Sequence, residues 1–175
     1  MSSIVPTIAE LMADCTRSAV HLEMRDHYGV AAEADDFRTW LETGRLDIDP
    51  GSSDWAPWVD LVTHAVARGV AVRRARIVSE PVSDYIRYEH ASTSVNVHAG
   101  EQVRWLPRRR ASDIALPGND FWLFDDRVVR WGHFSGDGAM VGHEISEDPA
   151  AAKLCAEAFD AVWVRAIPHD QYQIR

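Results

Sequence analysis

The chain has 175 residues, of which 46% are hydrophobic, so it is long enough to bury one sizeable core. Its formal net charge of −9 argues against general nucleic-acid binding, because contacts from Lys and Arg to phosphates supply most of that affinity. The N-terminus lacks a basic region followed by an apolar run, and no apolar stretch approaches the length of a membrane span. We therefore expect a cytoplasmic protein that binds neither membranes nor nucleic acid directly.

Two further features of the composition bear on chemistry. Cys15 and Cys155 stand on apolar faces of predicted helices without a paired spacing, so we expect reduced core thiols rather than zinc ligands or a redox dithiol. The segment 68–110 holds nine arginines against four acidic residues, a local charge of +5, so the rest of the chain carries −14. Arginine outnumbers lysine seventeen to one. This ratio fits the codon usage of a GC-rich genome, and the alternative is selection for bidentate contacts.

Residues 1–68 are predicted to be mainly helical. Apolar residues at spacings of three and four predict an amphipathic helix over 6–28. We interpret its polar last turns, residues 21–28, as a solvated or ion-paired helix end. The alternative is a metal site that uses His21 and His27 with Glu23 between them. Their order is not HExxH, however, and the sequence places no third ligand beside the two histidines. Further helices are expected over 34–43 and from residue 53 or 54 to Gly69.

Residues 69–175 are predicted to form a sheet with covering helices. Strands are expected over 70–78 and 101–106, separated by a helix with Ser79 as its N-cap and followed by a basic loop at 107–110. The apolar run Phe121–Phe124 predicts a strand buried on both faces. Asp125 and Asp126 then turn the chain into a hairpin partner at 127–134, and a Gly-containing turn leads to a strand at 139–145.

The last predicted element is a helix that starts at Asp148 and Pro149, as N-cap and first helical residue, and stops at Pro168. Its apolar stripe should lie on the sheet. The expected fold class is α/β (α+β), in a single domain over residues 1–175. It has a mixed central sheet of about five strands, a helical N-terminal part over 1–68, and a C-terminal helix packed on the sheet.

The order of elements over 69–166 resembles one half of a phospholipase-D-like domain. A strand, a helix and a strand precede a strand that ends in paired aspartates, a Gly-containing hairpin and a closing helix. In that superfamily a His-x-Lys-x4-Asp motif supplies the nucleophile and a phosphate contact. With Asp126 set as the aspartate, Asn119 stands where the histidine belongs and Phe121 where the lysine belongs. The resemblance therefore implies the fold and its cleft, but not phosphodiester cleavage by that route.

Over its full length the chain resembles a family of uncharacterised actinobacterial proteins, a domain of unknown function. The resemblance lies in His-Leu-Glu-Met-Arg-Asp at 21–26, Val-Ser-Glu-Pro-Val-Ser-Asp-Tyr at 78–85, Ala-Gly-Glu at 99–101 and Asn-Asp-Phe-Trp-Leu-Phe-Asp at 119–125. Members are often encoded beside helix-turn-helix regulators, so the resemblance implies such a regulator as a partner. Related half-domains commonly pair to complete one cleft, which implies a homodimer.

Polar residues on the elements that flank Phe121–Phe124 form the predicted ligand site. They are Tyr85, Arg87, Glu89, Glu101, Arg104, Asn119 and Asp120. An arginine-lined cleft suits an anionic small molecule, because guanidinium groups pair bidentately with carboxylate and phosphate oxygens. The alternative is that these arginines, with Arg73, Arg74 and Arg76, pair with the chain's own carboxylates.

No motif in the sequence implies a cofactor or a metal. There is no Gly-rich phosphate loop, no nucleophile elbow around a serine and no facing pair of carboxylates. His133 and His143 lie on consecutive predicted strands, and they form a general base or metal pair if the register brings them together. Asp125 and Asp126 are interpreted as turn residues rather than catalytic ones.

Two classes of function fit these patterns. The favoured one is a non-catalytic ligand-sensing or protein-interaction module, regulatory in role and acting with a helix-turn-helix regulator. The other is a small cytoplasmic enzyme of unassigned chemistry that acts on an anionic small molecule near Asn119 and Asp120. An enclosed pocket with mutually hydrogen-bonded Tyr, Glu and Arg would favour the enzyme, and a shallow apolar surface would favour an interaction module.

Overall fold

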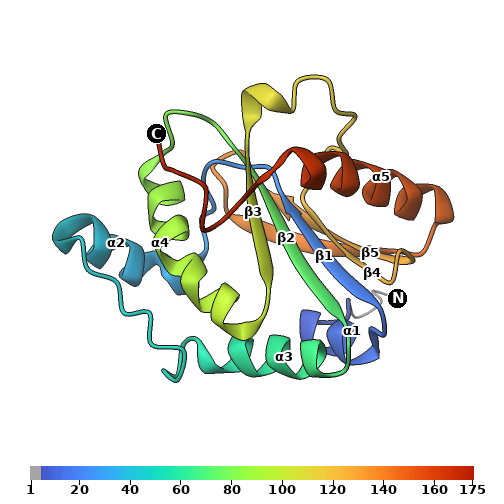
Figure 1. Ribbon diagram of the computed structural model, residues 1–175, viewed down its shortest axis with the longest axis horizontal. Coiled ribbons are helices and arrows are strands. Elements are labelled where there is room, and N and C mark those ends of the chain that lie inside the picture. The colour runs from blue at the N-terminus through green and yellow to red at the C-terminus, as the bar shows by residue number, and fades with distance from the viewer. Residues whose placement is uncertain (1–4) are drawn as a thin grey trace.

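The computed structural model describes residues 5–175, which form a mixed seven-stranded sheet between two layers of helices (Figure 1). In chain order the elements are α1 (Ile8–Asp14), β1 (Ser18–Glu23), η1 (Ala31–Glu33), α2 (Ala34–Thr43), α3 (Ala56–Ala67), β2 (Ala71–Val78), α4 (Asp84–Ala99), β3 (Gln102–Pro107), η2 (Arg108–Arg110), β4 (Phe121–Phe124), β5 (Val128–Phe134), β6 (Met140–Ser146), α5 (Pro149–Arg165) and β7 (Ile167–Pro168). The strand order is β6-β5-β4-β1-β2-β3-β7. The pairs β1–β2 and β2–β3 are parallel, and the other neighbouring pairs are antiparallel.

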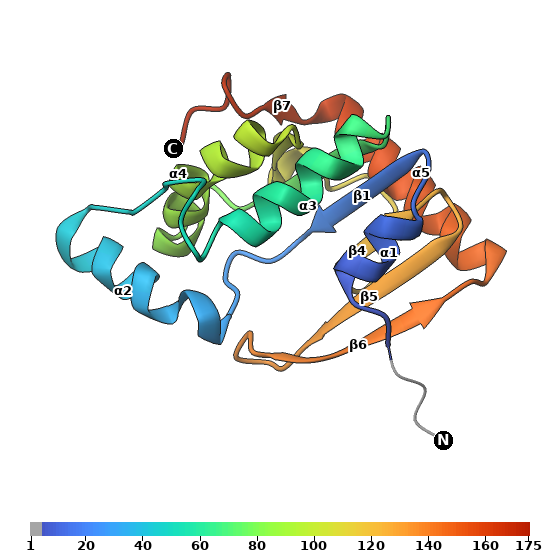
Figure 2. The same cartoon turned by 90° about the horizontal axis from the view of Figure 1, so that it is seen from below.

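Each face of the sheet has its own apolar core. On one face α5 places Phe159 and Val162 against Val20 and Leu22 of β1 and neighbouring strand residues. On the other face α1, α3 and α4 cover β1, β2 and β3, and α2 lies outside α4 (Figure 2). The helix predicted from Asp148 and Pro149 is confirmed: the Asp148 carboxylate accepts a hydrogen bond from the backbone N–H of Ala150, 3.0 Å away.

The middle strand of the sheet, β1, corrects the helix predicted over 6–28. The first helix ends at Asp14, and from Ser18 to Glu23 the side chains alternate between the two faces. Val20 and Leu22 alternate with His21 and Glu23, but the apolar residues here also continue the helical spacing of the preceding segment, so spacing alone does not separate a strand from a helix. The predicted division into a helical part over 1–68 and a later sheet is therefore wrong, because the N-terminal part supplies the central strand. The predicted strand Phe121–Phe124 is β4, which pairs with β1 on one side.

The helix predicted from Ser79 starts instead at Asp84, with Ser83 as its N-cap. Ser79 is engaged elsewhere, because its backbone N–H and its hydroxyl both donate to the Asp26 carboxylate, at 2.7 and 2.6 Å. The hydroxyl of Ser83 accepts from Ile86 N–H instead. Two smaller differences concern the basic loop and the number of strands. Residues 108–110, predicted as loop, form a 3-10 turn, and β1 and β7 bring the sheet to seven strands rather than about five.

The paired aspartates after β4 form the predicted hairpin turn, with φ values of 51° for Asp125 and 55° for Asp126. The Asp125 carboxylate also accepts hydrogen bonds from the backbone N–H groups of Thr16, Arg17 and Ser18, at 2.9, 2.7 and 3.0 Å. Burial alone would raise the pKa of Asp125, but these hydrogen bonds hold it well below its usual range. Asp125 therefore ties the β4–β5 turn to the start of β1.

Two other expectations concern the cysteines and the membrane. Cys15 and Cys155 are free and buried, as predicted. Throughout residues 5–175, no helix combines the length and the apolar character that crossing a membrane requires.

Candidate functional site

A pocket of about 330 Å³ lies on the face of the sheet that α3 and α4 cover. Its floor is made by β1, β2, β4, β5 and β6, and its walls by α4, the start of α3 and the segment that leads into η1. The register of the strands sets the floor side chains in two rows, because cross-strand partners point to the same face. The first row is Arg74, His21, Trp122 and Arg130. The second row holds Arg76 beside Glu23, then Asp120, Gly132 and His143.

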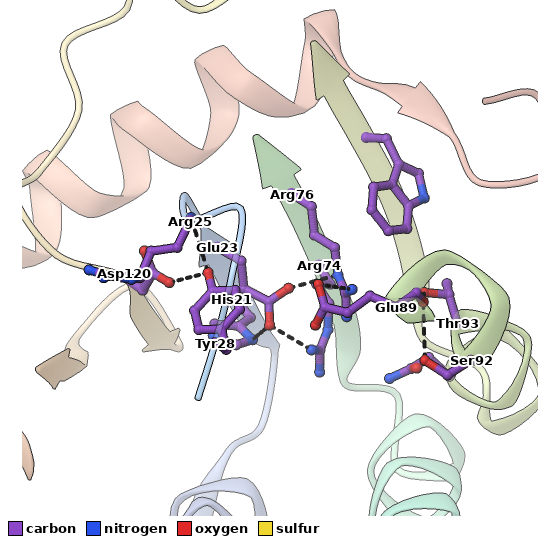
Figure 3. A network of polar contacts seen from close by, with 12 residues as sticks. His21, Glu23, Arg25, Tyr28, Arg74, Arg76, Glu89, Ser92, Thr93 and Asp120 are labelled. Carbon is purple, nitrogen blue, oxygen red and sulfur yellow. Dashed lines mark hydrogen bonds and ion pairs between the residues drawn. The ribbon is translucent and has the colours of Figure 1, made fainter. Parts of the chain in front are cut away.

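Two arginines of this floor are held by carboxylates of the chain itself (Figure 3). Arg76 lies 2.7 Å from Glu23 through Nε and 2.7 Å from Glu89 through Nη1. Arg74 lies 2.9 Å from Glu23 through Nη1 and 2.7 Å from Glu101 through Nε. Buried charges require such partners, because desolvation of an unpaired ion costs several kcal/mol. Internal pairing, the alternative given for the arginine-rich sequence, thus accounts for Arg74 and Arg76.

The same residues have shifted acid–base properties. Burial raises the pKa of Glu89 to about 8, although Arg76 opposes the shift. Burial alone would also raise the pKa of Glu23, but the charges of Arg76 and Arg74 outweigh it and lower this pKa to about 2. Burial lowers the pKa of His21 to about 3, so its imidazole is neutral at pH 7 and stacks on Trp122 with ring centroids 4.4 Å apart. The pocket therefore holds one firmly ionised carboxylate, one protonated carboxyl group and one neutral histidine.

Two tyrosines donate hydrogen bonds to further carboxylates that line the pocket, those of Asp120 and Glu33. Tyr28 donates a short hydrogen bond from its hydroxyl to Asp120, whose other oxygen accepts from the backbone N–H of Met24 at 3.0 Å. Burial raises the pKa of Asp120 to about 6. Tyr85 donates to Glu33 at 2.7 Å. Burial raises the pKa of both phenols, so they act as neutral donors at pH 7.

Arg130 differs from the other two floor arginines, because it forms no ion pair within residues 5–175. Its Nε donates to the backbone carbonyl of Pro6 at 3.1 Å, and its Nη1 lies 3.1 Å from Nδ1 of His143. Burial lowers the pKa of Arg130, with no carboxylate to oppose the shift. The buried indole N–H of Trp58, another pocket residue, also has no hydrogen-bond acceptor among the described residues. Because it has no ion-pair partner among the described residues, the guanidinium of Arg130 makes its side of the pocket suited to an anionic group.

The structure brings together part of the site predicted from sequence. Tyr85, Glu89 and Asp120 line the pocket, and Glu101 lies directly behind it, bonded to Arg74 and Asn96. The other three residues lie elsewhere. Asn119 is exposed beside Asp120, and Arg87 on α4 does not line the pocket.

Arg104 is a correction to the predicted site. Its Nη1 donates to the carbonyl of Trp163 at 3.0 Å, and its guanidinium lies 4.3 Å from the Trp163 ring centre. It therefore faces α5 on the opposite side of the sheet. Its strand neighbours Val103 and Trp105 face the α4 side, as the period of two requires.

Sequence reasoning missed His21, Glu23, Arg74, Arg76 and Arg130 as pocket residues. A usable signal was present, since His21 and Glu23, like Arg74 and Arg76, are spaced by two and would share one face of a strand. The helix predicted over 6–28 hid it. The register does not bring His133 and His143 together, because His143 pairs with Gly132 and His133 with Gly142 across β5 and β6, so the two side chains point to opposite faces. In the described part of the chain no three His, Cys, Asp or Glu residues are grouped to hold a metal.

Comparisons with known proteins support the fold. A search of curated proteins found no match. Among solved structures, the chain is similar to a phospholipase D family member, Nuc from Salmonella typhimurium, with a TM-score of 0.52 and 12% identity over 91% of this chain and 86% of that one. It also resembles TrmBL2, an archaeal chromatin protein with a novel mode of DNA binding, at a TM-score of 0.48 and 14% identity. That match covers 91% of this chain and 48% of the other.

At 12% identity, the likeness to Nuc shows the fold alone. The phospholipase-D-like architecture predicted for residues 69–166 is confirmed, and it extends over 91% of the chain because β1 belongs to the same sheet. The family comparison covers nearly the same range. A family model described as a domain of unknown function (DUF6879) matches residues 6–174, and the chain therefore belongs to that family.

Proposed function

We propose that this protein is a small-molecule-binding module whose ligand occupies the pocket and places an anionic group against Arg130. The observation that carries this proposal is the state of Arg130, a pocket-lining guanidinium that forms no ion pair within residues 5–175. A half-buried guanidinium is costly without a counter-charge, and an oxyanion of the ligand would supply one through charge-assisted hydrogen bonds. The sequence-based expectation of an anionic ligand is thereby kept, with Arg130 in the role first assigned to Arg104.

The shape of the site favours a small molecule over a protein partner. The pocket, at about 330 Å³, lies at the lower end of the volumes typical of small-molecule sites. By contrast, the exposed apolar residues are spread over α2, α3, α4, β6 and α5, for example Leu41, Val97, Val141 and Val164. Scattered apolar residues do not make an interaction patch. Ligand sensing is therefore the better supported half of the sequence-based proposal.

An enzyme acting on the same ligand is the second candidate, and one observation favours it. Glu89 and Asp120, with pKa values raised to about 8 and about 6, are suited to acid–base chemistry near neutral pH. The pocket serine argues the other way, because the Ser92 hydroxyl donates to the carbonyl of Glu89 at 3.1 Å and is not paired with a base. We therefore propose a non-catalytic role first.

We further propose that a helix-turn-helix regulator reads the ligand state of this module. The family resemblance supports this, since members are often encoded beside such regulators. A ligand that bridges the sheet and α4 would stabilise the bound form, and a partner that recognises that form would respond to the ligand. The cytoplasmic location, the actinobacterial source and the homodimer remain predictions.

The ligand site is tested by removing one guanidinium. Arg130→Ala should lose ligand-induced stabilisation, because a charge-assisted bidentate contact contributes about 1.5 to 3 kcal/mol, or roughly 10- to 100-fold in affinity. The measurement is thermal shift followed by calorimetry with acetate, succinate, citrate, inorganic phosphate, sugar phosphates and amino acids. Arg127→Ala is the matched control, because Arg127 directly precedes the same strand, β5, but is exposed and paired with Glu147 at 2.7 Å. Equal stabilisation of the Arg130→Ala variant, or none of the wild type by any of these compounds, would contradict the proposal.

A further inference from the structure

The side of the pocket opposite Arg130 carries more negative charge than the protein neutralises. Four buried carboxyl groups gather there, those of Glu23, Glu89, Glu101 and Asp120, each less than 10% exposed. Three arginines lie near them: Arg76, also buried, Arg74, with 11% of its side chain exposed, and Arg25, whose charge acts on Asp120. A fifth carboxylate, Glu33, lines the same pocket and is bonded by Tyr85. The formal charge of the five acids and three arginines is therefore −2.

The carboxylates also retain unused acceptor capacity. Oε2 of Glu23 and Oε2 of Glu89 each lie 2.7 Å from an Arg76 nitrogen, yet neither accepts an aligned hydrogen bond, because the guanidinium N–H bonds point away from these contacts. Both residues line the pocket and are 8% exposed. A buried acceptor without a donor is costly. These two oxygens are fully covered and lie against Arg76 rather than the cavity, so the carboxyl groups of Glu23 and Glu89 would act on a ligand through their negative charge.

In the unliganded protein at neutral pH, a proton on Glu89 offsets part of the excess charge, whereas Asp120 is mostly ionised. The pKa of Glu89 is raised to about 8 and that of Asp120 to about 6, in each case mainly by burial. A cation placed between these groups would do the same by Coulomb attraction, which is strong in a site that excludes water. The groups around Glu89 are Arg76 and Glu23 on the floor, Glu33 on the wall and Arg74 farther away. With Glu89 itself ionised, these five groups carry a net charge of −1, so a ligand cation that displaces the Glu89 proton meets a net negative surrounding.

The acidic side and Arg130 share one floor. Arg130 on β5 is two strands from Glu23 on β1 and two positions farther along the sheet, by the pairing of His21 with Trp122 and of Trp122 with Arg130. Standard strand spacings put their Cα atoms about 12 Å apart, and both side chains reach into the pocket between them. Trp122 and Trp58 pack edge to face there, with ring centroids 5.9 Å apart. An apolar surface thus separates a negative end from a positive one.

Building on the proposed function, we propose that the ligand is a zwitterion of amino-acid size, with its protonated amino group against Glu23, Glu89 and Asp120 and its carboxylate against Arg130. The two ends of the pocket then neutralise the two ends of the ligand. A simple dicarboxylate would not neutralise the carboxylates of the acidic side, and a simple amine would leave Arg130 without a counter-charge. The chemical class follows from this arrangement of charge.

The test uses matched probes that remove one charge at a time. The twenty common L-amino acids, 4-aminobutyrate and 6-aminohexanoate are screened by thermal shift, and each binder is compared with its N-acetyl and primary-amide derivatives by calorimetry. We expect at least one amino acid to bind, and both derivatives to bind at least tenfold more weakly. The N-acetyl derivative loses the cation and keeps the carboxylate, and the amide does the reverse. Each end of the pocket is therefore tested separately.

Variants assign the two ends. Glu89→Gln replaces a group that is already protonated at neutral pH, so the fold should persist, while the zwitterion should bind at least tenfold more weakly and the N-acetyl derivative equally well. Glu157→Gln, on the exposed face of α5, is the control and should change neither affinity. At pH 7 the wild type should release a proton from Glu89 on binding the amino acid, so the heats measured in bis-Tris and Tris, which differ in ionisation enthalpy and carry no anionic group, should differ. Equal heats would overturn the assignment of Glu89.

The outcomes separate this inference from the proposed function. If the N-acetyl derivative binds as well as its parent, the cationic half is wrong and the anion site at Arg130 stands. If no amino acid binds while a plain carboxylate or phosphate does, the zwitterion is likewise refuted and the proposed function stands. If neither class binds, both proposals fail.

Discussion

At the scale of single residues, the clearest consequence of the fold is the burial of Glu89. It belongs to α4, is 8% exposed, and has Arg76 as its ion-pair partner at 2.7 Å. A carboxyl group in such a place is ionised at a cost, because the attraction of one misaligned guanidinium does not offset the lost hydration. The proton on Glu89 is therefore part of the folded state at neutral pH, and stability must depend on it.

Glu89 should make the protein less stable as the pH rises from about 4.5 to about 8. Its pKa is raised from 4.5 to about 8 on folding, so in this window folding takes up a proton and the free energy of unfolding falls with increasing pH. Below the window both states are protonated and above it both are ionised, so the dependence ends. A single group contributes at most about 1.4 kcal/mol per pH unit. Asp120 adds to the decline in the lower part of the window, because its pKa is raised from 3.8 to about 6.

Urea denaturation of the wild type and Glu89→Gln between pH 5 and pH 8 measures this effect. The variant cannot ionise, so its stability relative to the wild type should increase by at least about 1 kcal/mol across the range. Glu157→Gln, whose side chain is 68% exposed in the wild type, should follow the wild-type profile. Parallel profiles for the wild type and Glu89→Gln would show that Glu89 is not protonated in the fold.

At the scale of elements, what the sequence could predict depended on whether an element carries local signals. Asp148 and Pro149 begin α5 through their own side-chain chemistry, and Asp125 and Asp126 form a turn that suits their residue type, so both were predictable. β1 has no such signal. Its pattern suits a helix, and its place in the sheet depends on pairing with β2 and β4, which lie about 50 and 100 residues later. The floor of the pocket depends on the same pairings, so His21 and Glu23 escaped prediction with the strand, whereas Tyr85, Glu89 and Asp120 were predicted.

Val20→Ala distinguishes a strand from a helix at this position. In a helix, alanine has the higher propensity and the change would be neutral or stabilising. In β1, Val20 is 3% exposed and packs in the α5-side core, so removing two methyl groups should destabilise the protein by about 2 kcal/mol through lost burial and a small cavity. Chemical denaturation measures the change. Val164→Ala is the control, because Val164 on α5 is 77% exposed and its truncation should stay within about 0.5 kcal/mol. A stabilised Val20→Ala variant would contradict the central strand.

At the scale of the whole molecule, the arginine-rich segment 68–110 serves mainly as internal cross-links. Arg68 donates to the carbonyl of Met12 at 2.7 Å, and Arg108 donates to the carbonyls of Met24 and Ile77 at 2.6 and 3.1 Å. Arg74 and Arg76 are taken up by the pocket network. The local surplus of +5 in the sequence therefore does not become a basic surface.

The negative charge outside the pocket predicts how the stability of the protein depends on salt. By formal charge, before the proton on Glu89 is counted, the four buried acids and the two pocket arginines account for −2 of the total of −9, which leaves −7 on the rest of the chain. Such a surface repels itself at neutral pH, and the exposed ion pairs that salt also weakens contribute little each. Raising NaCl from 0.05 to 0.5 M at pH 7 should therefore increase stability by about 1 kcal/mol, or roughly 2 to 4 °C in the melting temperature.

The control for this salt effect is the same titration near the isoelectric point. At pH 5.3, close to the sequence pI, the net charge vanishes and screening has little repulsion to relieve, so the increase should shrink towards zero. Differential scanning calorimetry at both pH values makes the comparison. An equal increase at pH 5.3 would attribute the effect to general salting-out rather than to charge. A decrease at pH 7 would mean that exposed ion pairs such as Arg127–Glu147, 2.7 Å apart, outweigh the repulsion. The pocket network is buried and should be screened far less in either case, so the salt response reports the surface and the Glu89 profile reports the pocket.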